Sequence, residues 1–111
     1  KRLSEDELGA LWEIYTNDKS RKDVRDKLIV QYIYLIRYVV GRVKVTLPPT
    51  ISLEDVAGYG VEGLISAVEK YSPQKNARFE TYALIRIKGS MLDKIRAEDF
   101  LPRSLRKTNL S

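Results

Sequence analysis

The sequence predicts an all-α fold, a compact bundle of about four helices in one domain. Three observations favour this class. Apolar residues recur at helical spacing in four segments, Gly and Pro are scarce (6 and 4 of 111 residues), and no segment alternates apolar and polar residues as a strand does. A chain of this length fits one domain and leaves little room for two.

The first helix starts at a capping box, in which Ser4 and Glu7 satisfy each other's backbone N–H groups. The apolar residues that follow at helical spacing are Leu8, Leu11, Trp12 and Tyr15. They predict a helix of about 11 residues. A polar break at 16–19 then separates this helix from the next.

A long second helix is predicted to begin at Ser20 or Asp23. Its apolar stripe contains Val24, Leu28, Tyr32, Leu35, Ile36, Val39 and Val43. We expect it to end before Pro48 and Pro49, because neither proline can donate a helical hydrogen bond.

The third helix begins at Ser52, with acidic residues in its first turn, where the helix dipole favours them. Its inner side carries Val56, Gly60, Gly63, Leu64, Ala67, Val68 and Tyr71, and its outer side Asp55, Gly58, Tyr59, Glu62, Ser66 and Glu69. Each helical glycine costs up to about 1 kcal/mol relative to alanine. Close helix packing would explain Gly60 and Gly63, whereas core packing explains Gly58 on the polar side less well.

The fourth helix is predicted from about Glu80 to Asp99, ending before Pro102. Its inner stripe is Leu84, Ile87, Met91 and Ile95, and its outer side carries Tyr82, Arg86, Gly89, Ser90, Asp93 and Arg96. We therefore place a domain at 1–102. We interpret the short basic stretch 103–111 as the start of a further segment. The chain also lacks an initial Met, and we therefore expect it to be part of a longer protein.

Charge is distributed unevenly along the chain, whose formal net charge is +5. Residues 1–69 carry 10 basic and 11 acidic side chains, whereas 70–111 carry 10 basic and 4 acidic ones. The whole excess thus lies in the C-terminal part, which indicates an acidic partner such as nucleic acid. A solvated basic face is the alternative.

The composition disfavours catalysis. The chain has no Cys and no His, which excludes their nucleophiles and bases and the usual zinc sites. Gly58, Gly60 and Gly63 match a dinucleotide-binding glycine pattern as a bare string, but they follow no strand. No run reaches the ~20 apolar residues of a membrane span. We expect a cytoplasmic binding protein, with no enzymatic activity, metal or cofactor.

Residues 75–96 have the composition of a site for single-stranded nucleic acid. Lys75, Arg78, Arg86 and Arg96 are interleaved with Phe79 and Tyr82, and the hydroxyl of Thr81 lies among them. Aromatic rings stack on unpaired bases while the basic groups neutralise phosphates. The alternative is that Phe79 and Tyr82 are core residues at a helix start.

Several segments in register resemble region 2 of bacterial sigma factors, and within that family the flagellar and sporulation (FliA/SigD/WhiG-type) subgroup. The matching segments are 28–30, 38–42, 55–71, 78–83, 86–96 and 98–106. The resemblance covers about residues 5–107. It implies a subunit that binds core RNA polymerase and recognises and melts the −10 promoter element.

The resemblance implies two sets of binding residues. The face that docks on the β′ clamp helices of the polymerase would be Asp55, Gly58, Tyr59, Val61, Glu62 and Ile65. The DNA-binding residues would be Lys75, Arg78, Phe79, Thr81, Tyr82, Arg86, Gly89, Asp93 and Arg96. In such proteins a base of the non-template strand is flipped into the segment around Tyr82.

The chain departs from housekeeping sigma factors at three places. Those factors usually carry Gln-Glu where Gly58-Tyr59 stands here, an aromatic residue in place of Ala77, and a Trp pair in place of Ile85-Arg86. Without the Trp pair, we expect Arg86, Asp93 and Arg96 to contact the duplex edge of the −10 element, where Arg86 can pair with a guanine.

The resemblance also implies further partners. Factors of this subgroup are commonly held by anti-sigma factors, FlgM-like or cyclic-di-GMP-dependent RsiG-like, and a −35-reading domain is expected beyond Ser111. The alternative is a helical regulatory adaptor whose basic face is incidental.

Overall fold

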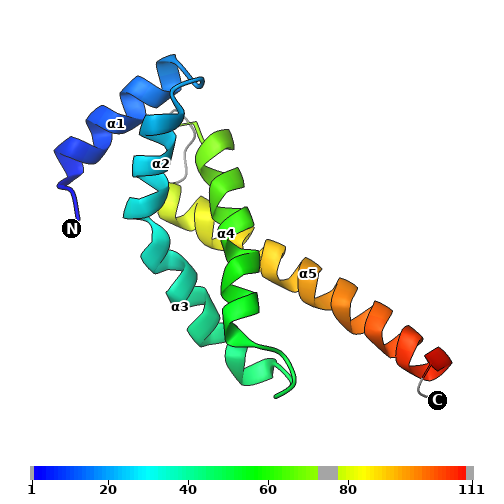
Figure 1. Cartoon of the computed structure of the whole chain (residues 1–111). Coiled ribbons are helices and arrows are strands. Elements are labelled where there is room, and N and C mark those ends of the chain that lie inside the picture. Colours follow the sequence, from blue (N-terminus) through cyan, green and yellow to red (C-terminus); the bar gives the residue numbers. More distant parts are fainter. Residues whose placement is uncertain (1, 73–77, 110–111) are drawn as a thin grey trace.

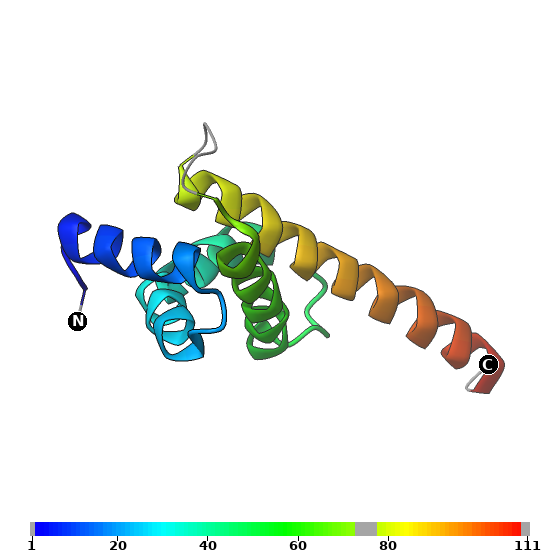
Figure 2. The ribbon, with the colours of Figure 1, turned by 90° about the horizontal axis from the view of Figure 1, so that it is seen from above.

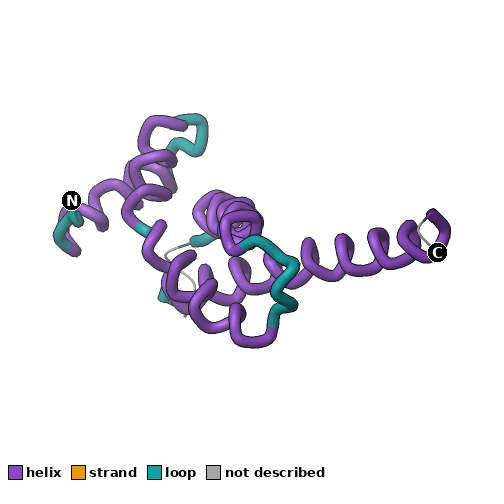
Figure 3. The backbone as a smooth tube through the Cα atoms, turned by 60° about the horizontal axis from the view of Figure 1, so that its bottom comes forward, coloured by secondary structure: helices purple, strands orange, loops and turns teal. Residues whose placement is uncertain are grey.

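Five α-helices and one 3₁₀ turn account for most of the described chain. The computed structural model describes residues 2–72 and 78–109, with side chains up to Ala97. The helices are α1 (Glu5–Asn17), α2 (Lys22–Gln31), α3 (Ile33–Val43), α4 (Leu53–Lys70) and α5 (Phe79–Asn109), and the turn is η1 (Lys44–Thr46). The described ranges contain helices and loops and no strand, which confirms the all-α class (Figure 3).

Two predicted helix starts are formed by side-chain caps. Ser4 Oγ accepts from the backbone N–H of Glu7 at 3.2 Å, and the Glu7 carboxylate accepts from the Ser4 N–H at 2.9 Å. Ser52 Oγ accepts from the N–H groups of Glu54 (3.1 Å) and Asp55 (3.4 Å). These bonds satisfy N–H groups that have no partner within the helix, and so fix where α1 and α4 begin.

The predicted long second helix is wrong in one respect, because it is two helices that meet at Tyr32. Tyr32 leaves the helical conformation (φ −111°, ψ 10°), and its ring joins an aromatic cluster. The Trp12 indole N–H donates to the Tyr32 hydroxyl at 3.2 Å, and the Tyr32 and Phe79 rings lie 4.5 Å apart. Tertiary packing thus overrides a helical period that continues through this residue.

The aromatic cluster joins three parts of the chain at one end of the bundle. Trp12, Tyr71 and Phe79 have ring centroids 4.9 to 5.2 Å apart, within the range of favourable edge and tilted contacts. Burial raises the pKa of the Tyr71 and Tyr32 phenols. The phenols of the cluster therefore stay protonated and neutral. Packing of these rings holds α1 and the start of α5 against the bundle.

The α4–α5 pair forms the most extensive helix contact, and α4 crosses α5 in Figure 1. A Cβ at Gly63 would lie 2.6 Å from the Arg86 carbonyl oxygen, and one at Gly60 would lie 2.5 Å from the Met91 methyl group. Gly63 is therefore required by the close approach of the two helix backbones, as predicted, whereas the atom nearest a Cβ at Gly60 is the end of a flexible side chain. Ile87 and Met91 of α5 are fully buried against them.

The predicted end of the last helix before Pro102 is also wrong, because α5 continues to Asn109. A proline removes one N–H from the hydrogen-bond ladder but does not by itself prevent the backbone from staying helical. The C-terminal half of α5 projects beyond the other helices (Figure 2). No helix in the part of the chain that the structure describes is both long and apolar enough to cross a bilayer.

Candidate functional site

The outer side of α4 presents the six residues predicted to dock on the polymerase. Asp55, Gly58 and Glu62 are exposed, Val61 is 39% exposed, and Tyr59 and Ile65 are partly buried. No atom lies within 4 Å of a Cβ placed at Gly58. Packing within this chain therefore does not require a glycine there, in contrast to Gly60 and Gly63 on the inner side. We call these six residues the α4 outer face.

Contacts from α5 hold the middle of the α4 outer face. Ser90 Oγ donates to the Tyr59 carbonyl oxygen at 2.8 Å, and Lys94 Nζ lies 3.3 Å from a carboxylate oxygen of Glu62. The Lys94–Glu62 pair is exposed, so it contributes little to stability. The Ser90 bond fixes the α4 backbone at the residue whose side chain is expected to meet a partner.

The outer side of α5 carries most of the predicted DNA-binding residues. Arg78, Thr81, Gly89, Asp93 and Arg96 are exposed, and Tyr82 and Arg86 are partly buried. Lys75 lies outside the described residues. We call the described residues on this side, together with Arg78 directly before the helix, the α5 outer face: Arg78, Thr81, Tyr82, Arg86, Gly89, Asp93 and Arg96.

Two arginines of the α5 outer face make only loose ion pairs. Arg78 lies 3.8 Å from Glu80, and Arg96 lies 3.9 Å from Asp93. All these pairs are substantially exposed, and exposed pairs are worth about 0–1 kcal/mol. A phosphate group can therefore compete with these carboxylates for the guanidinium groups.

Phe79 does not belong to this exposed set. Its side chain is only 4% exposed and lies in the aromatic cluster, so the interpretation as an exposed stacking ring is wrong. The first turn of α5 is covered by α1 and by the α2–α3 junction, which one helix's periodicity could not show. Phe79 instead anchors the start of α5, from which Thr81 projects, while the Tyr82 ring packs 5.7 Å from the Tyr71 ring.

Arg86 is held in a defined position between α4 and α5. Its Nη2 donates to Ser66 Oγ at 2.7 Å, and its guanidinium carbon lies 5.5 Å from the centre of the Tyr82 ring. Its Nε is buried and has no hydrogen-bond partner among the described residues, so it is closed to a ligand. Ser66 and the Tyr82 ring thus orient the guanidinium, a planar group whose terminal N–H groups can pair with a hydrogen-bond acceptor.

A cleft of about 490 Å³ surrounds Arg86 and runs between the two outer faces. It is lined by Glu62, Gly63, Ser66, Ile85, Arg86, Gly89, Ser90, Asp93 and Lys94. Sequence reasoning placed Ser66 and Ser90 on the polar sides of their helices but gave them no role, and it missed Lys94. Short hydroxyl side chains on both facing helices, beside glycines, were the available signal.

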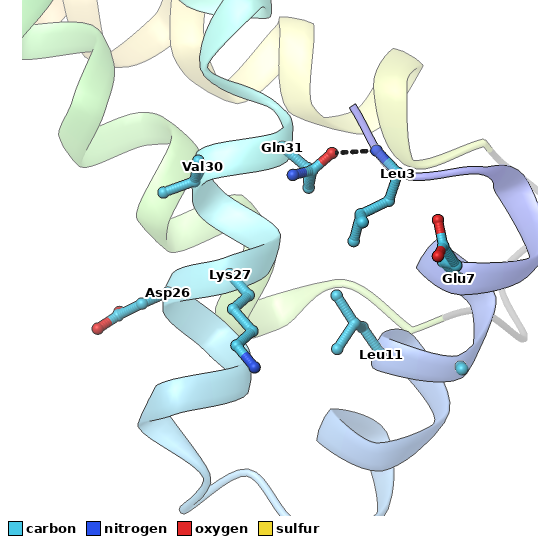
Figure 4. Close-up of a pocket in the computed structure, with 8 residues that line it drawn as sticks. Leu3, Glu7, Leu11, Asp26, Lys27, Val30 and Gln31 are labelled. Atoms are coloured by element: carbon cyan, nitrogen blue, oxygen red, sulfur yellow. Dashed lines mark hydrogen bonds between the residues drawn. The ribbon is translucent and has the colours of Figure 1, made fainter. Parts of the chain in front are cut away.

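A second cleft, of about 630 Å³, lies between α1 and α2 and contains no predicted site residue (Figure 4). Leu3 and Leu11 line one side, and Val30 and the stem of Lys27 the other. The Leu3 backbone N–H donates to the Gln31 side-chain oxygen at 2.8 Å and closes one end. This cleft is distinct from the one that contains Arg86.

Comparison with known proteins gives matches that include both faces. Residues 28–100 match the family described as Sigma-70 region 2. The chain is 40% identical over 96 residues to the RNA polymerase sigma-D factor of Bacillus subtilis (strain 168), which is 85% of this chain and 38% of that protein. It is 42% identical over 77 residues to the RNA polymerase sigma factor FliA of Escherichia coli (strain K12), covering 69% of this chain and 32% of the relative.

A third relative agrees with these two. Identity to the RNA polymerase sigma factor FliA of Pseudomonas aeruginosa is 40% over 83 residues, which are 75% of this chain and 34% of that protein. The chain thus spans less than two-fifths of the length of these curated relatives. The family match includes α3, α4 and most of α5, with both outer faces. The chain belongs to the Sigma-70 region 2 family.

Proposed function

We propose that this chain is the promoter-binding domain of an RNA polymerase sigma factor of the FliA and sigma-D type. In this proposal the α4 outer face docks on the β′ clamp helices of core polymerase, and the α5 outer face recognises and melts the −10 element. The observation that carries the proposal is the family match across two adjacent, outward-facing surfaces on helices that pack closely together.

Docking on the α4 outer face follows from its shape and chemistry. Gly58 leaves an open position at which a partner helix can approach closely, and Asp55 and Glu62 present carboxylates on either side. Tyr59 adds an aromatic ring, a residue type enriched at binding hot spots. Such a surface suits a helical partner that supplies basic or hydrogen-bond-donating side chains.

DNA binding on the α5 outer face uses a ring, a guanidinium group and exposed cations. The partly buried Tyr82 ring offers a stacking platform for a base flipped from the non-template strand. Arg86, held by Ser66 at 2.7 Å, is positioned to pair with the edge of a guanine. Replacing Arg86 with Ala should weaken recognition at one −10 position, and an unchanged base preference would reject this role.

The proposal extends to an anti-sigma factor as a regulatory partner. An inhibitor of the FlgM-like or RsiG-like kind would prevent docking by covering Tyr59, the partly buried ring of the α4 outer face. For the RsiG-like kind, the cyclic-di-GMP would belong to the inhibitor interface. The domain would act in the cytoplasm, where promoter DNA and polymerase are found.

Fluorescence anisotropy of the 111-residue chain tests the proposal. Three samples are compared: labelled −10 non-template strand, a scrambled strand of the same composition, and core polymerase titrated with the labelled chain. We expect binding to core polymerase and tighter binding to the −10 strand than to the scrambled strand. Equal binding to both strands together with no polymerase binding would instead support a helical adaptor with an incidental basic face.

A further inference from the structure

The exposed side of α3 forms a third charged surface, which lies outside both outer faces. Tyr34, Arg37, Tyr38, Gly41 and Arg42 are spaced three and four residues apart and share one side of the helix. Four of them are exposed, and Tyr34 is partly buried. The opposite side of α3 contributes Leu35, Ile36, Val39 and Val43 to the core. We call the five exposed-side residues the α3 cationic face.

The cations of α3 and of the turn that follows it form no ion pair among the described residues. Residues 27–53 contain four basic side chains and no acidic one. Within the described ranges, no carboxylate contacts Arg37, Arg42 or Lys44, and Arg42 instead donates to the Tyr38 hydroxyl at 3.3 Å. In contrast, Arg21, Arg25, Arg78 and Arg96 each pair with a carboxylate. The positive charge of α3 is therefore left for a partner outside this chain.

Aromatic rings lie among these cations. Tyr38 is 52% exposed, and the Arg42 guanidinium carbon lies 5.6 Å from the centre of its ring. At the other end of the face, the Arg2 guanidinium carbon lies 4.1 Å from the centre of the Tyr34 ring. Alternating guanidinium groups and rings match a strand whose phosphates and bases alternate.

Gly41 lies within the α3 cationic face, and packing inside the chain does not explain why this residue is a glycine. A Cβ placed there would have no atom within 4 Å, so no neighbouring helix requires the glycine. Glycine inside a helix is less stable than alanine. A bare backbone between Arg37 and Arg42 leaves room for the backbone of a ligand to approach the helix closely.

The face is continuous with the start of the proposed DNA-binding helix. The Tyr34 ring lies 6.5 Å from the Tyr32 ring, which lies 4.5 Å from Phe79, the first residue of α5. Helix α3 also packs directly on α5. A nucleic acid strand that leaves the first turn of α5 therefore meets α3 at its Tyr34 end.

We propose that the α3 cationic face binds single-stranded DNA without sequence preference, through phosphate contacts by Arg37 and Arg42 and base stacking on Tyr38. This goes beyond the proposed function, which assigns DNA to α5. Single-stranded DNA fits better than an acidic protein surface, because carboxylates would use the cations alone and leave the exposed ring without a role.

The test is the salt dependence of binding between the 111-residue chain and a labelled single strand of scrambled sequence. The variant R37Q/R42Q should bind about tenfold more weakly at 0.1 M salt, with a log–log salt slope smaller by about 1.4, since each lost single-strand phosphate contact removes about 0.7. The matched control R21Q/K22Q removes the same charge from two exposed positions, the N-cap and the first residue of α2, and should retain the slope. Equal slopes for the two variants would overturn the proposal.

Two further variants test the ring. Y38A should weaken binding about fivefold or more, while Y38F, which keeps the ring and loses only the hydroxyl, should bind like the unchanged chain. If polyglutamate competes as well as the strand does and Y38A has no effect, the surface is one for acidic proteins and the proposal is wrong. The difference in affinity between the −10 strand and the scrambled strand is measured separately and reports on the α5 outer face. Failure of the proposed function and failure of this proposal are therefore distinguishable.

Discussion

Glycines have different roles in the buried seam between α4 and α5 and on the outer face of α4. In the seam, Gly63 allows the two backbones to approach so closely that a Cβ would lie 2.6 Å from the Arg86 carbonyl oxygen, and a Cβ at Gly60 would lie 2.5 Å from the Met91 methyl group. On the α4 outer face, a Cβ at Gly58 would meet no atom of another described element within 4 Å. The difference teaches that fold and binding depend on separate residues of one helix, so substitutions should separate the two.

The largest expected effect is at the aromatic end of the seam. Phe79→Ala should lower the free energy of unfolding by about 3–5 kcal/mol, because it removes a buried ring and leaves a cavity. Urea denaturation followed by circular dichroism measures this change. Tyr82→Ala, three residues on and only partly buried, should lose clearly less stability. Equal losses would mean that Phe79 and Tyr82 do not differ in role.

A second comparison sets one glycine against another on α4. Gly63→Ala should cost about 1–3 kcal/mol of stability, since the atoms it meets are the backbone of Arg86 and Ile87 and cannot move cheaply. Gly58→Ala should instead stabilise the domain by up to about 1 kcal/mol through helix propensity. Thermal unfolding of the two variants checks both signs. Destabilisation by Gly58→Ala would show that the outer position is also packed.

These comparisons show how far the sequence could lead. Helical periodicity separated the inner from the outer side of α4 correctly, because one helix's own geometry determines it. It misplaced Phe79 because α1 and the α2–α3 junction, distant in sequence, cover that ring. It missed the break at Tyr32 for the same reason, since the Trp12 and Phe79 contacts there are tertiary.

For the binding residues, too, the sequence indicated which residues form each face but not the contacts between helices. The family resemblance supplied both faces, but neither it nor periodicity indicated that Ser66 holds Arg86. That contact depends on the angle and register at which α4 and α5 cross. The assignment of each face to a partner stays a prediction until binding is measured.

A smaller effect is expected from the Ser66–Arg86 contact. Ser66→Ala should change stability by about 1 kcal/mol or less, because Arg86 is only partly buried and can reach water. It should weaken binding to the −10 strand several-fold while leaving binding to a scrambled strand unchanged, since it frees Arg86 without removing its charge. Ser72→Ala, another partly buried serine, is the control in the same anisotropy assay. An unchanged preference for the −10 strand would show that Arg86 needs no support.

The smallest effect concerns pH and lies away from the faces. Hydrogen bonds from Arg21, at 2.8 and 3.0 Å, lower the pKa of Asp23 from 3.8 to about 2. A lowered pKa means that this carboxylate contributes its stabilisation above pH 4 and loses it as the pH falls towards 2. Titration of the Asp23 side chain by NMR measures the value. Arg21→Gln should return the pKa towards 3.8, and a pKa near 3.8 in the unchanged chain would contradict the contact.

The central claim, that the two outer faces bind different partners, is tested most directly by a double dissociation in the 111-residue chain. Tyr59→Ala and Tyr82→Ala are each titrated with core polymerase and with the −10 non-template strand, after circular dichroism shows that both variants are folded. Each should lose about tenfold in affinity, about 1.4 kcal/mol, for one partner only: Tyr59→Ala for polymerase and Tyr82→Ala for DNA. The account is contradicted if both variants lose the same partner, or if neither loses any.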